Sequence, residues 1–288
     1  MSQEKYSNIV SIDWLKNNLT NLDLVILDTT MKKKPNGESI PTPAVKILGA
    51  KSFNFDTQIC DQNTDLPHML PTPSEFQHSV RELGISANSI IVVYDAMGIF
   101  SSPRAWWMFK TMGHKEVYVL NGGLPKWIEA GLPTTEEYSN TSANELGNFE
   151  SKFNHSMVKS SKEVLSAIDS DQIQILDARS VGRFKGIEPE PRAGLKSGHI
   201  PASKCIPFTE TMLDGFFKTK NELVNIFESK IESNAKELIF SCGSGVTASI
   251  LALVANECGY QNIAVYDGSW SEWGDNDSLP IEVSIDKI

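Results

Sequence analysis

Cysteine is scarce in this chain of 288 residues, and its four copies are scattered: Cys60, Cys205, Cys242 and Cys258. No two of them form a C-x-x-C pair, and no group of His and Cys has the spacing of a zinc site. This excludes a disulfide framework and a classical zinc module. Few, dispersed cysteines indicate a reducing compartment in which thiols stay free. The cytoplasm is therefore the default prediction, with an organelle matrix as the alternative.

Long apolar runs and a positive charge balance are also missing. The longest apolar runs, such as Ile250–Ala255, are far too short to span a membrane. Residues 1–5 lack a basic region followed by an apolar stretch, so no secretory signal is evident. The net charge of -10 argues against binding nucleic acid or an anionic membrane through bulk electrostatics. A small anionic substrate is still allowed, because local arginines can override the global field.

The length and the internal pattern of the chain indicate two domains. Short apolar runs that read as buried strands recur in the same order in both halves, at 24–28, 90–94 and 117–120 and again at 173–177, 238–241 and 263–266. Helix-like segments at 103–112 and 246–258 follow the middle run of each half and end at a glycine.

Glycine and tryptophan spacings support the same repeat. In each half nine positions separate two glycines, Gly113 from Gly122 and Gly259 from Gly268. Five further positions lead to a tryptophan, at 127 and at 273. The order of strand, helix and strand predicts an α/β fold of two tandem copies of one domain, each a parallel sheet with helices on both faces. We predict the domains at 1–135 and 159–288, with a polar linker at 136–158.

One loop carries the residue types of a nucleophilic site. The strand that ends at Ser241 is followed by Cys242-Gly243-Ser244-Gly245-Val246-Thr247. In parallel α/β sheets ligands bind where the strands end. Glycines allow a curled backbone whose N–H groups point inward, and the next helix adds its positive end. Such a loop favours the thiolate of Cys242 and places the backbone of Gly243, Gly245, Val246 and Thr247 around a bound substrate.

Three other interpretations of this loop are possible. A Walker A loop needs a Gly-Lys-Ser/Thr segment, and no lysine is present. A cysteine phosphatase needs an arginine six positions after the cysteine, where this chain has Ala248, so transition-state charge would go unbalanced. The third interpretation is a buried structural cysteine in a tight turn, which is common for free cysteines. The glycines, the strand before and the helix after favour a functional cysteine.

The combined motifs identify a family resemblance that covers essentially the whole chain. The loop Cys-Gly-Ser-Gly-Val-Thr-Ala from Cys242, the segment Gly-His-Ile-Pro-Ala from Gly198 and the segment Asp-Gly-Ser-Trp-Ser-Glu-Trp from Asp267 closely resemble the tandem rhodanese-domain sulfurtransferases, in particular the 3-mercaptopyruvate sulfurtransferase branch. In that family the second domain carries the catalytic cysteine and the first is a degenerate copy. This chain has Asp95 at the first-domain position that corresponds to Cys242.

The resemblance also implies roles for residues outside the loop. Arg183 and Arg192 match positions that bind the carboxylate and ketone oxygen of the donor, for which the planar guanidinium is suited. From the residues alone, two surface arginines paired with Glu188 and Glu190 are an equal alternative. His68 and Asp56 match a polar relay with Cys242 and Ser244.

The spacing between Asp56 and His68 is one residue longer than the family pattern, which makes His68 the firmer of the two assignments. A histidine among prolines is more often a packed or exposed loop residue. In the relay, Asp56 would orient the imidazole, and His68 or Ser244 would handle the donor's thiol proton.

The resemblance predicts a covalent two-step sulfur transfer. Cys242 takes the sulfur of 3-mercaptopyruvate as a persulfide, releases pyruvate and passes the sulfur to thioredoxin, another thiol or cyanide. No metal or organic cofactor is required, because the sulfur is the cargo. Relatives specific for thiosulfate carry Arg and Lys in the loop, where this chain has neutral residues. The alternatives are thiosulfate as the preferred donor on the same scaffold and a non-catalytic rhodanese-fold interaction module.

Overall fold

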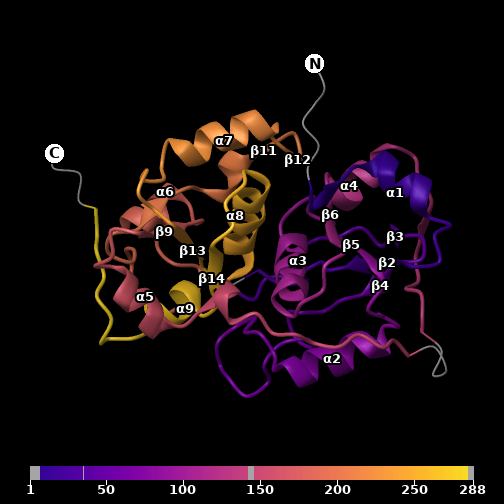
Figure 1. Ribbon diagram of the computed structural model, residues 1–288, viewed down its shortest axis with the longest axis horizontal. Coiled ribbons are helices and arrows are strands. Elements are labelled where there is room, and N and C mark those ends of the chain that lie inside the picture. The colour runs from indigo at the N-terminus through magenta and orange to yellow at the C-terminus, as the bar shows by residue number, and fades with distance from the viewer. Residues whose placement is uncertain (1–6, 35, 142–145, 285–288) are drawn as a thin grey trace.

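The computed structural model of the protein describes residues 7–34, 36–141 and 146–284 (Figure 1). The first half contains β1 (Ile9–Val10), α1 (Ile12–Asn18), β2 (Leu24–Asp28), β3 (Lys46–Ile47), β4 (Lys51–Ser52), α2 (Pro73–Glu82), β5 (Ile90–Tyr94), α3 (Ser102–Thr111), β6 (Val117–Leu120), α4 (Gly123–Glu129) and β7 (Thr134–Thr135). The second half contains η1 (His155–Met157), β8 (Val158–Lys159), α5 (Ser161–Ala167), β9 (Ile173–Asp177), α6 (Val181–Lys185), β10 (Lys204–Cys205), η2 (Phe208–Thr211), β11 (Met212–Leu213), β12 (Phe216–Phe217), α7 (Lys220–Glu228), β13 (Glu237–Ser241), α8 (Val246–Glu257), β14 (Ile263–Tyr266) and α9 (Ser269–Trp273).

Each half forms one five-stranded parallel sheet. The strand orders are β4-β2-β5-β6-β1 and β10-β9-β13-β14-β8, and every neighbouring pair in both sheets is parallel. The two orders correspond strand by strand, so the repeat in the sequence is a repeat of topology. The predicted fold class is confirmed.

Side-chain caps determine where several helices begin. Thr72 caps α2 and exchanges hydrogen bonds with Glu75, a capping box that satisfies two free N–H groups of the first turn. Ser160 with Glu163 does the same at α5. α8 differs, because it begins directly after Gly245 in a left-handed conformation and has no side-chain cap. Its first-turn N–H groups therefore remain available to a ligand.

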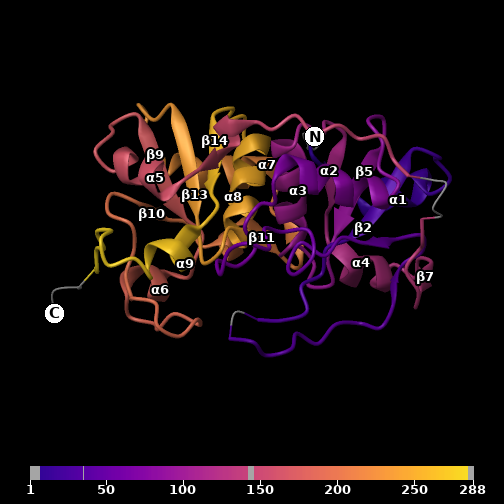
Figure 2. The same cartoon turned by 90° about the horizontal axis from the view of Figure 1, so that it is seen from below.

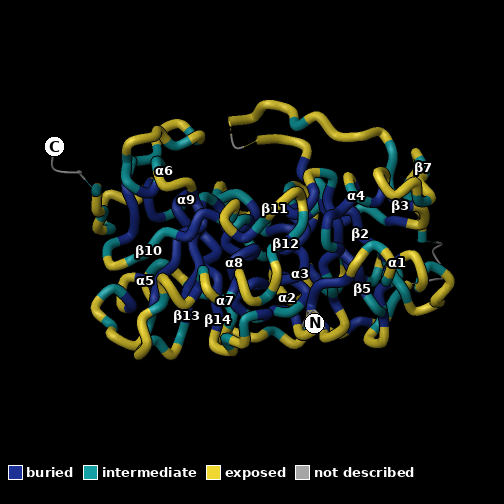
Figure 3. The backbone as a smooth tube through the Cα atoms, turned by 90° about the horizontal axis from the view of Figure 1, so that it is seen from above, coloured by how far each residue is buried: buried dark blue, intermediate teal, exposed yellow. Residues whose placement is uncertain are grey.

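Helices cover both faces of each sheet, and the two halves share one core. In the first half α1 and α4 pack on one face, and α2 and α3 pack on the other. In the second half α5 and α9 cover one face, and α7 and α8 cover the other. α3 and α8 pack against each other between the sheets, and the buried cluster is continuous across them (Figures 1 and 3). The two domains therefore hold a fixed relation through apolar packing.

Polar contacts secure the same interface on one side. Glu257, at the end of α8, is 3% exposed and accepts hydrogen bonds from the backbone N–H groups of Ser7 and Asn8 at 2.7 and 2.5 Å. Its oxygens also accept from the Ser7 hydroxyl and the Asn8 amide. The beginning of the first domain is thus fastened to the last turn of α8.

The carboxyl ends of both sheets face the same side of the molecule. α4, α6 and α9 begin shortly after β6, β9 and β14, and Figure 2 shows them along one edge. Loops from both domains therefore meet there.

The chain crosses between domains after β7, which pairs with β3, and before β8, which pairs with β14. The boundaries at 135 and 159 stay a prediction, and residues 1–6, 142–145 and 285–288 lie outside the described part.

Candidate active site

Cys242 lies where β13 ends and is only 2% exposed. The hydroxyl of Ser269 accepts hydrogen bonds from the N–H groups of Cys242 and Gly245, at 3.2 and 3.1 Å, and donates one to the carbonyl of Tyr266. Ser269 is fully buried and has a positive φ of 48°. One hydroxyl therefore fastens both ends of the cysteine loop to the segment after β14.

The backbone of the loop presents donors rather than acceptors. The carbonyl of Cys242 accepts from the N–H of Trp270, and the carbonyl of Gly243 accepts from the N–H and hydroxyl of Ser271. The N–H groups of Gly243 and Ser244 have no hydrogen-bond partner among the described residues. With the carbonyls occupied by α9, the loop offers free N–H donors, as an anion-binding nest does.

The remaining loop residues continue this arrangement into α8. Gly245 has φ +75°, a conformation that glycine adopts without steric cost. Val246 and Thr247 form the first turn of α8, where N–H groups lack intrahelical partners and the helix end is positive. Gly243, Gly245, Val246 and Thr247 therefore stand together, and their backbone contact with a substrate remains a prediction.

Arg183 and Arg192 both reach the cysteine loop. A methyl group added at Gly243 would lie 3.3 Å from Nη2 of Arg183 and 3.7 Å from Nη1 of Arg192. Arg183 also pairs with the buried carboxylate of Glu190 at 2.5 Å. Burial lowers the pKa of Arg192, while the neighbouring charge of Cys242 acts in the opposite direction. The two guanidiniums are placed differently, since Arg183 is balanced by an acid and Arg192 faces the cysteine.

The first domain contributes His68, which approaches Arg192 and Ser244. Nη2 of Arg192 lies 3.5 Å from Nε2 of His68 and 3.4 Å from the Ser244 hydroxyl. On the other side of the ring, Oδ1 of Asp56 is 3.0 Å from Nδ1, although the ring N–H is poorly aligned with it. The longer spacing between Asp56 and His68 therefore does not separate them.

Burial lowers the pKa of His68, and the charges of Arg104 and Arg192 lower it further. Contact with Asp56 raises that pKa and opposes both effects without outweighing burial. The imidazole is therefore neutral at pH 7, with one ring nitrogen able to accept a proton. When Nδ1 carries the ring proton toward Asp56, Nε2 is the accepting nitrogen and faces Nη2 of Arg192.

Four further residues complete the site and received no site role in the sequence analysis: Arg104, Glu190, Asp267 and Ser269. Arg104 and Asp267 form a buried ion pair between the domains at 2.7 Å. The sequence suggests Glu190 only as a surface partner of arginines, yet its side chain is 1% exposed and pairs with both Arg179 and Arg183. Asp267 and Ser269 belong to the Asp-Gly-Ser-Trp segment, and that motif is the signal that could have found them.

The other polar residues noted in the sequence have structural surroundings. Arg179 is buried between Asp177 and Glu190. Nδ1 of His199 donates a hydrogen bond to the Phe184 carbonyl at 2.7 Å. Burial raises the pKa of both Cys205 and Cys258 to about 12 and also raises that of Cys60. These three thiols are therefore poor nucleophiles at neutral pH.

Asp95 stands at the matching position of the first domain and fills its own loop. Oδ2 of Asp95 accepts from the N–H groups of Phe100, Ser101 and Ser102 at 2.9–3.0 Å and from the Ser102 hydroxyl, and Oδ1 accepts from the N–H of Met97. Five donors thus surround one carboxylate. The first copy shows that a curled loop at the end of this strand can hold an anion, and no thiol is present there.

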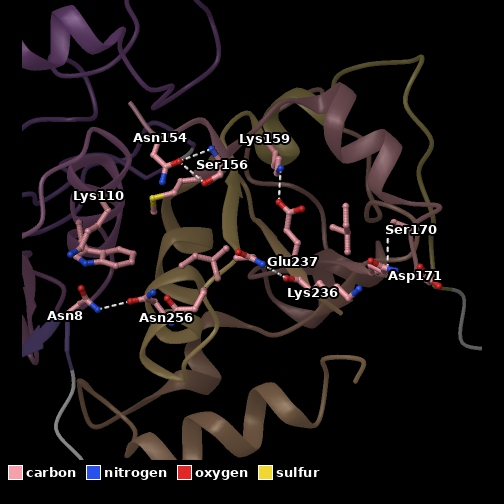
Figure 4. A pocket seen from close by; sticks show the side chains of 17 residues that line it. Asn8, Lys110, Asn154, Ser156, Lys159, Ser170, Asp171, Lys236, Glu237 and Asn256 are labelled. Atoms are coloured by element: carbon pink, nitrogen blue, oxygen red, sulfur yellow. Dashed lines mark hydrogen bonds and ion pairs between the residues drawn. The ribbon is translucent and has the colours of Figure 1, made fainter. Parts of the chain in front are cut away.

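A cavity of about 790 Å³ lies at the opposite edge of the second sheet and is not this site. It is lined by the first residues of β9, β13 and β14, with Lys110 and Asn8 from the first domain (Figure 4). Its lining contains neither cysteine nor histidine, and Lys159 is paired with Glu237 across it at 2.8 Å.

Within residues 7–34, 36–141 and 146–284, no cluster of three or more His, Cys, Asp and Glu could hold a metal ion. None of the helices in these ranges is long and apolar enough to cross a membrane.

Comparison with known proteins gives consistent matches. A model of the rhodanese-like domain matches residues 11–130 and 160–276. Thiosulfate/3-mercaptopyruvate sulfurtransferase 2 of Arabidopsis thaliana is 39% identical over 299 residues, covering 95% of this chain and 86% of the relative. The 3-mercaptopyruvate sulfurtransferase of Escherichia coli K12 is 39% identical over 280 residues, covering 95% and 97%. The crystal structure of SseA from Escherichia coli, described as a 3-mercaptopyruvate sulfotransferase, superposes with a TM-score of 0.78 at 34% identity over 92% of this chain and 99% of that one.

Proposed function

This chain belongs to the rhodanese-like domain family, and from that premise we propose that it is a 3-mercaptopyruvate sulfurtransferase whose sulfur carrier is Cys242. One observation carries the proposal. Cys242 directly follows β13, the next two residues have unpartnered N–H groups among the described residues, and two arginines reach the adjacent Gly243. A neutral histidine from the other domain approaches the same arginine and Ser244. This arrangement suits a nucleophile that must hold a second, anionic sulfur.

In the first half-reaction the Cys242 thiolate attacks the sulfur of the donor. The new S–S bond forms as the donor's C–S bond breaks, and the electron pair of that bond goes to carbon as the enolate of pyruvate. Arg183 and Arg192 hold the carboxylate and ketone oxygen, so the enolate charge develops next to guanidinium donors. The proton of the donor thiol passes through Ser244 or His68 to the enolate carbon, which gives pyruvate.

The persulfide anion then occupies the curled loop. The N–H groups of Gly243 and Ser244 and the first turn of α8 provide donors for the outer sulfur. Asp95 is the support for this step, because the first domain holds a carboxylate in the matching loop with five donors. No charge from a loop side chain is needed.

In the second half-reaction a thiol acceptor attacks the outer sulfur and regenerates Cys242. We propose a protein dithiol such as thioredoxin as the acceptor, with cyanide as a small-molecule substitute.

We also propose a cytoplasmic location, because the four cysteines are free. Domains at 1–135 and 159–288 with a linker at 136–158 complete the proposal.

The neutral loop is the reason for preferring 3-mercaptopyruvate over thiosulfate. Thiosulfate places its charge next to the transferred sulfur, whereas mercaptopyruvate carries its carboxylate away from it. The side chains of Gly243, Ser244 and Gly245 carry no charge, so the cations at this site are the guanidiniums of Arg183 and Arg192, which suit a carboxylate. Donor charge and protein charge then match for mercaptopyruvate.

The test is a comparison of kcat/KM for the two donors with cyanide as acceptor, using the wild-type chain and Cys242→Ser. We expect mercaptopyruvate to be preferred and the variant to be inactive with an unchanged circular dichroism spectrum. A preference for thiosulfate would overturn the donor assignment. Activity retained in Cys242→Ser would overturn the carrier, and a folded, inactive wild-type chain would indicate a binding module.

A further inference from the structure

Arg104 is a fully buried cation that joins the two domains beside the candidate active site. It is the third residue of α3 in the first domain and is 0% exposed. Its Nη2 lies 2.7 Å from Oδ1 of Asp267, the residue that follows β14 in the second domain. The same nitrogen donates to the backbone carbonyl of His68. A single guanidinium therefore contacts both domains.

Asp267 holds the same segment at a second point. Its Oδ2 accepts a hydrogen bond from the N–H of Leu70 at 2.8 Å. The ion pair is thus hydrogen-bonded to the backbone at the carbonyl of residue 68 and at the N–H of residue 70. His68 has φ +63°, a left-handed conformation that costs free energy for any residue but glycine. Contacts on both sides of this strained residue explain how the conformation is maintained.

The same pair also touches the cysteine loop. A methyl group added at Gly245 would lie 2.8 Å from Nη1 of Arg104 and 3.1 Å from the carbonyl of Asp267. The guanidinium stacks on the ring of Trp107, with its carbon 4.5 Å from the ring centroid. Arg104 is therefore confined between a tryptophan, the loop glycine and the histidine segment, and it cannot move without disturbing them.

We propose that Arg104 and Asp267 are positioning residues for the sulfur-transfer reaction, which set the imidazole of His68 relative to the loop of Cys242. This rests on the proposed function, because the reaction is the one in which His68 and Cys242 take part. The first domain has Asp95 in place of a nucleophilic cysteine. Through this ion pair it positions its own His68 against the cysteine loop of the second domain. Arg104 and Asp267 do not contact the donor, because Arg183 and Arg192 hold its carboxylate.

The predicted signature is a loss of kcat with little change of KM. A misplaced His68 slows proton handling by about 10- to 100-fold, whereas the donor clamp stays intact. We expect Asp267→Asn, which keeps the shape of the side chain and removes its charge, to lower kcat in this range while KM changes less than about twofold. Arg104→Gln should act in the same way. Because it leaves Asp267 buried without a cation, the double variant Arg104→Gln/Asp267→Asn is made as well.

Glu257→Gln is the matched control. Glu257 is also a buried acid at the domain interface, but its partners are Ser7 and Asn8 rather than the active-site segment. This variant should lower the melting temperature and leave kcat within about twofold of the wild type. If Glu257→Gln and Asp267→Asn lowered kcat equally, the effect would be one of domain packing, and the positioning role would be overturned.

A double-mutant cycle with His68→Asn separates this proposal from the proposed function. If Arg104 and Asp267 act through His68, Asp267→Asn causes no further loss of kcat in the His68→Asn background. Losses that multiply would contradict the positioning role and leave the Cys242 chemistry intact. If His68→Asn alone left kcat unchanged, the proposed relay itself would fail, whatever the ion pair does.

Discussion

Replacing Ser269 with alanine should loosen the cysteine loop more than its small size suggests. The hydroxyl accepts from two buried N–H groups, those of Cys242 and Gly245, and donates to the Tyr266 carbonyl. A buried donor left without a partner costs about 1–3 kcal/mol. Two such donors predict a loss of about 2–6 kcal/mol in the free energy of unfolding.

The matched control is Ser249→Ala, a fully buried serine a few residues along α8. Its hydroxyl donates to the carbonyl of Gly245 at 2.8 Å, and no N–H group depends on it. We expect this variant to cost about 1 kcal/mol. Urea unfolding of both variants measures the difference, and kcat with mercaptopyruvate should fall at least about tenfold for Ser269→Ala only. Equal losses of stability and of rate in the two variants would refute the assigned role of the hydroxyl.

Three further predictions follow from the same geometry. Gly245→Ala should lose more stability and rate than Gly259→Ala, since both have positive φ but only the first meets a neighbour, Arg104 Nη1 at 2.8 Å; equal effects in urea unfolding and rate would contradict this. Because burial lowers the pKa of His68 against the opposing effect of Asp56, the transfer rate should stay level as the pH falls to about 6.5 and decline below it. The unfolded imidazole binds its proton first, so the free energy of unfolding should fall in the same direction; a rate that falls already between pH 8 and 7 would contradict this. Arg192→Lys should raise the KM for mercaptopyruvate about tenfold or more, because lysine cannot form the two-point contact with a carboxylate; an unchanged KM would remove Arg192 from the donor clamp.

The three inner strands of each five-stranded sheet were predictable almost residue by residue, because each is a short apolar run bounded by polar or turn residues, whereas the bounds of the two-residue edge strands were not predicted. The runs at 24–28, 90–94 and 117–120 coincide with β2, β5 and β6, and 173–177 and 263–266 coincide with β9 and β14. The run at 238–241 lacks only the first residue of β13. α3 and α8 begin and end within one residue of their predicted limits. Local patterns were sufficient here because both domains repeat them.

The site was predictable only where a motif marked it. The loop from Cys242 to Thr247 stands out in the sequence, and the resemblance brought in His68, Asp56 and the two arginines. Arg104 has no such motif, and although Asp267 and Ser269 lie in the Asp-Gly-Ser-Trp motif, their contacts form only when α3 packs on α8 and the segment after β14 folds over the loop. Arg104 stands at the start of a helix, and nothing in the sequence around it indicates that its partner is Asp267, 163 positions later in the other domain.

The burial of Cys242 does not by itself show whether the thiol is functional or structural. The structural interpretation of Cys242 rested on free cysteines being commonly buried, and Cys242 is indeed 2% exposed. Burial alone therefore does not separate a carrier thiol from a packed one. What differs is the surroundings: Cys205 and Cys258 have apolar or acidic neighbours that raise the thiol pKa to about 12. Cys242 has guanidiniums and free N–H groups beside it.

Mass spectrometry of the intact chain and its peptides, after brief exposure to 3-mercaptopyruvate without an acceptor, tests whether Cys242 carries the transferred sulfur. We expect one added sulfur atom, located on the peptide that contains Cys242 and removed by cyanide. A chain that turns over the donor but carries no added sulfur there, or carries it on Cys60, Cys205 or Cys258 instead, would contradict it.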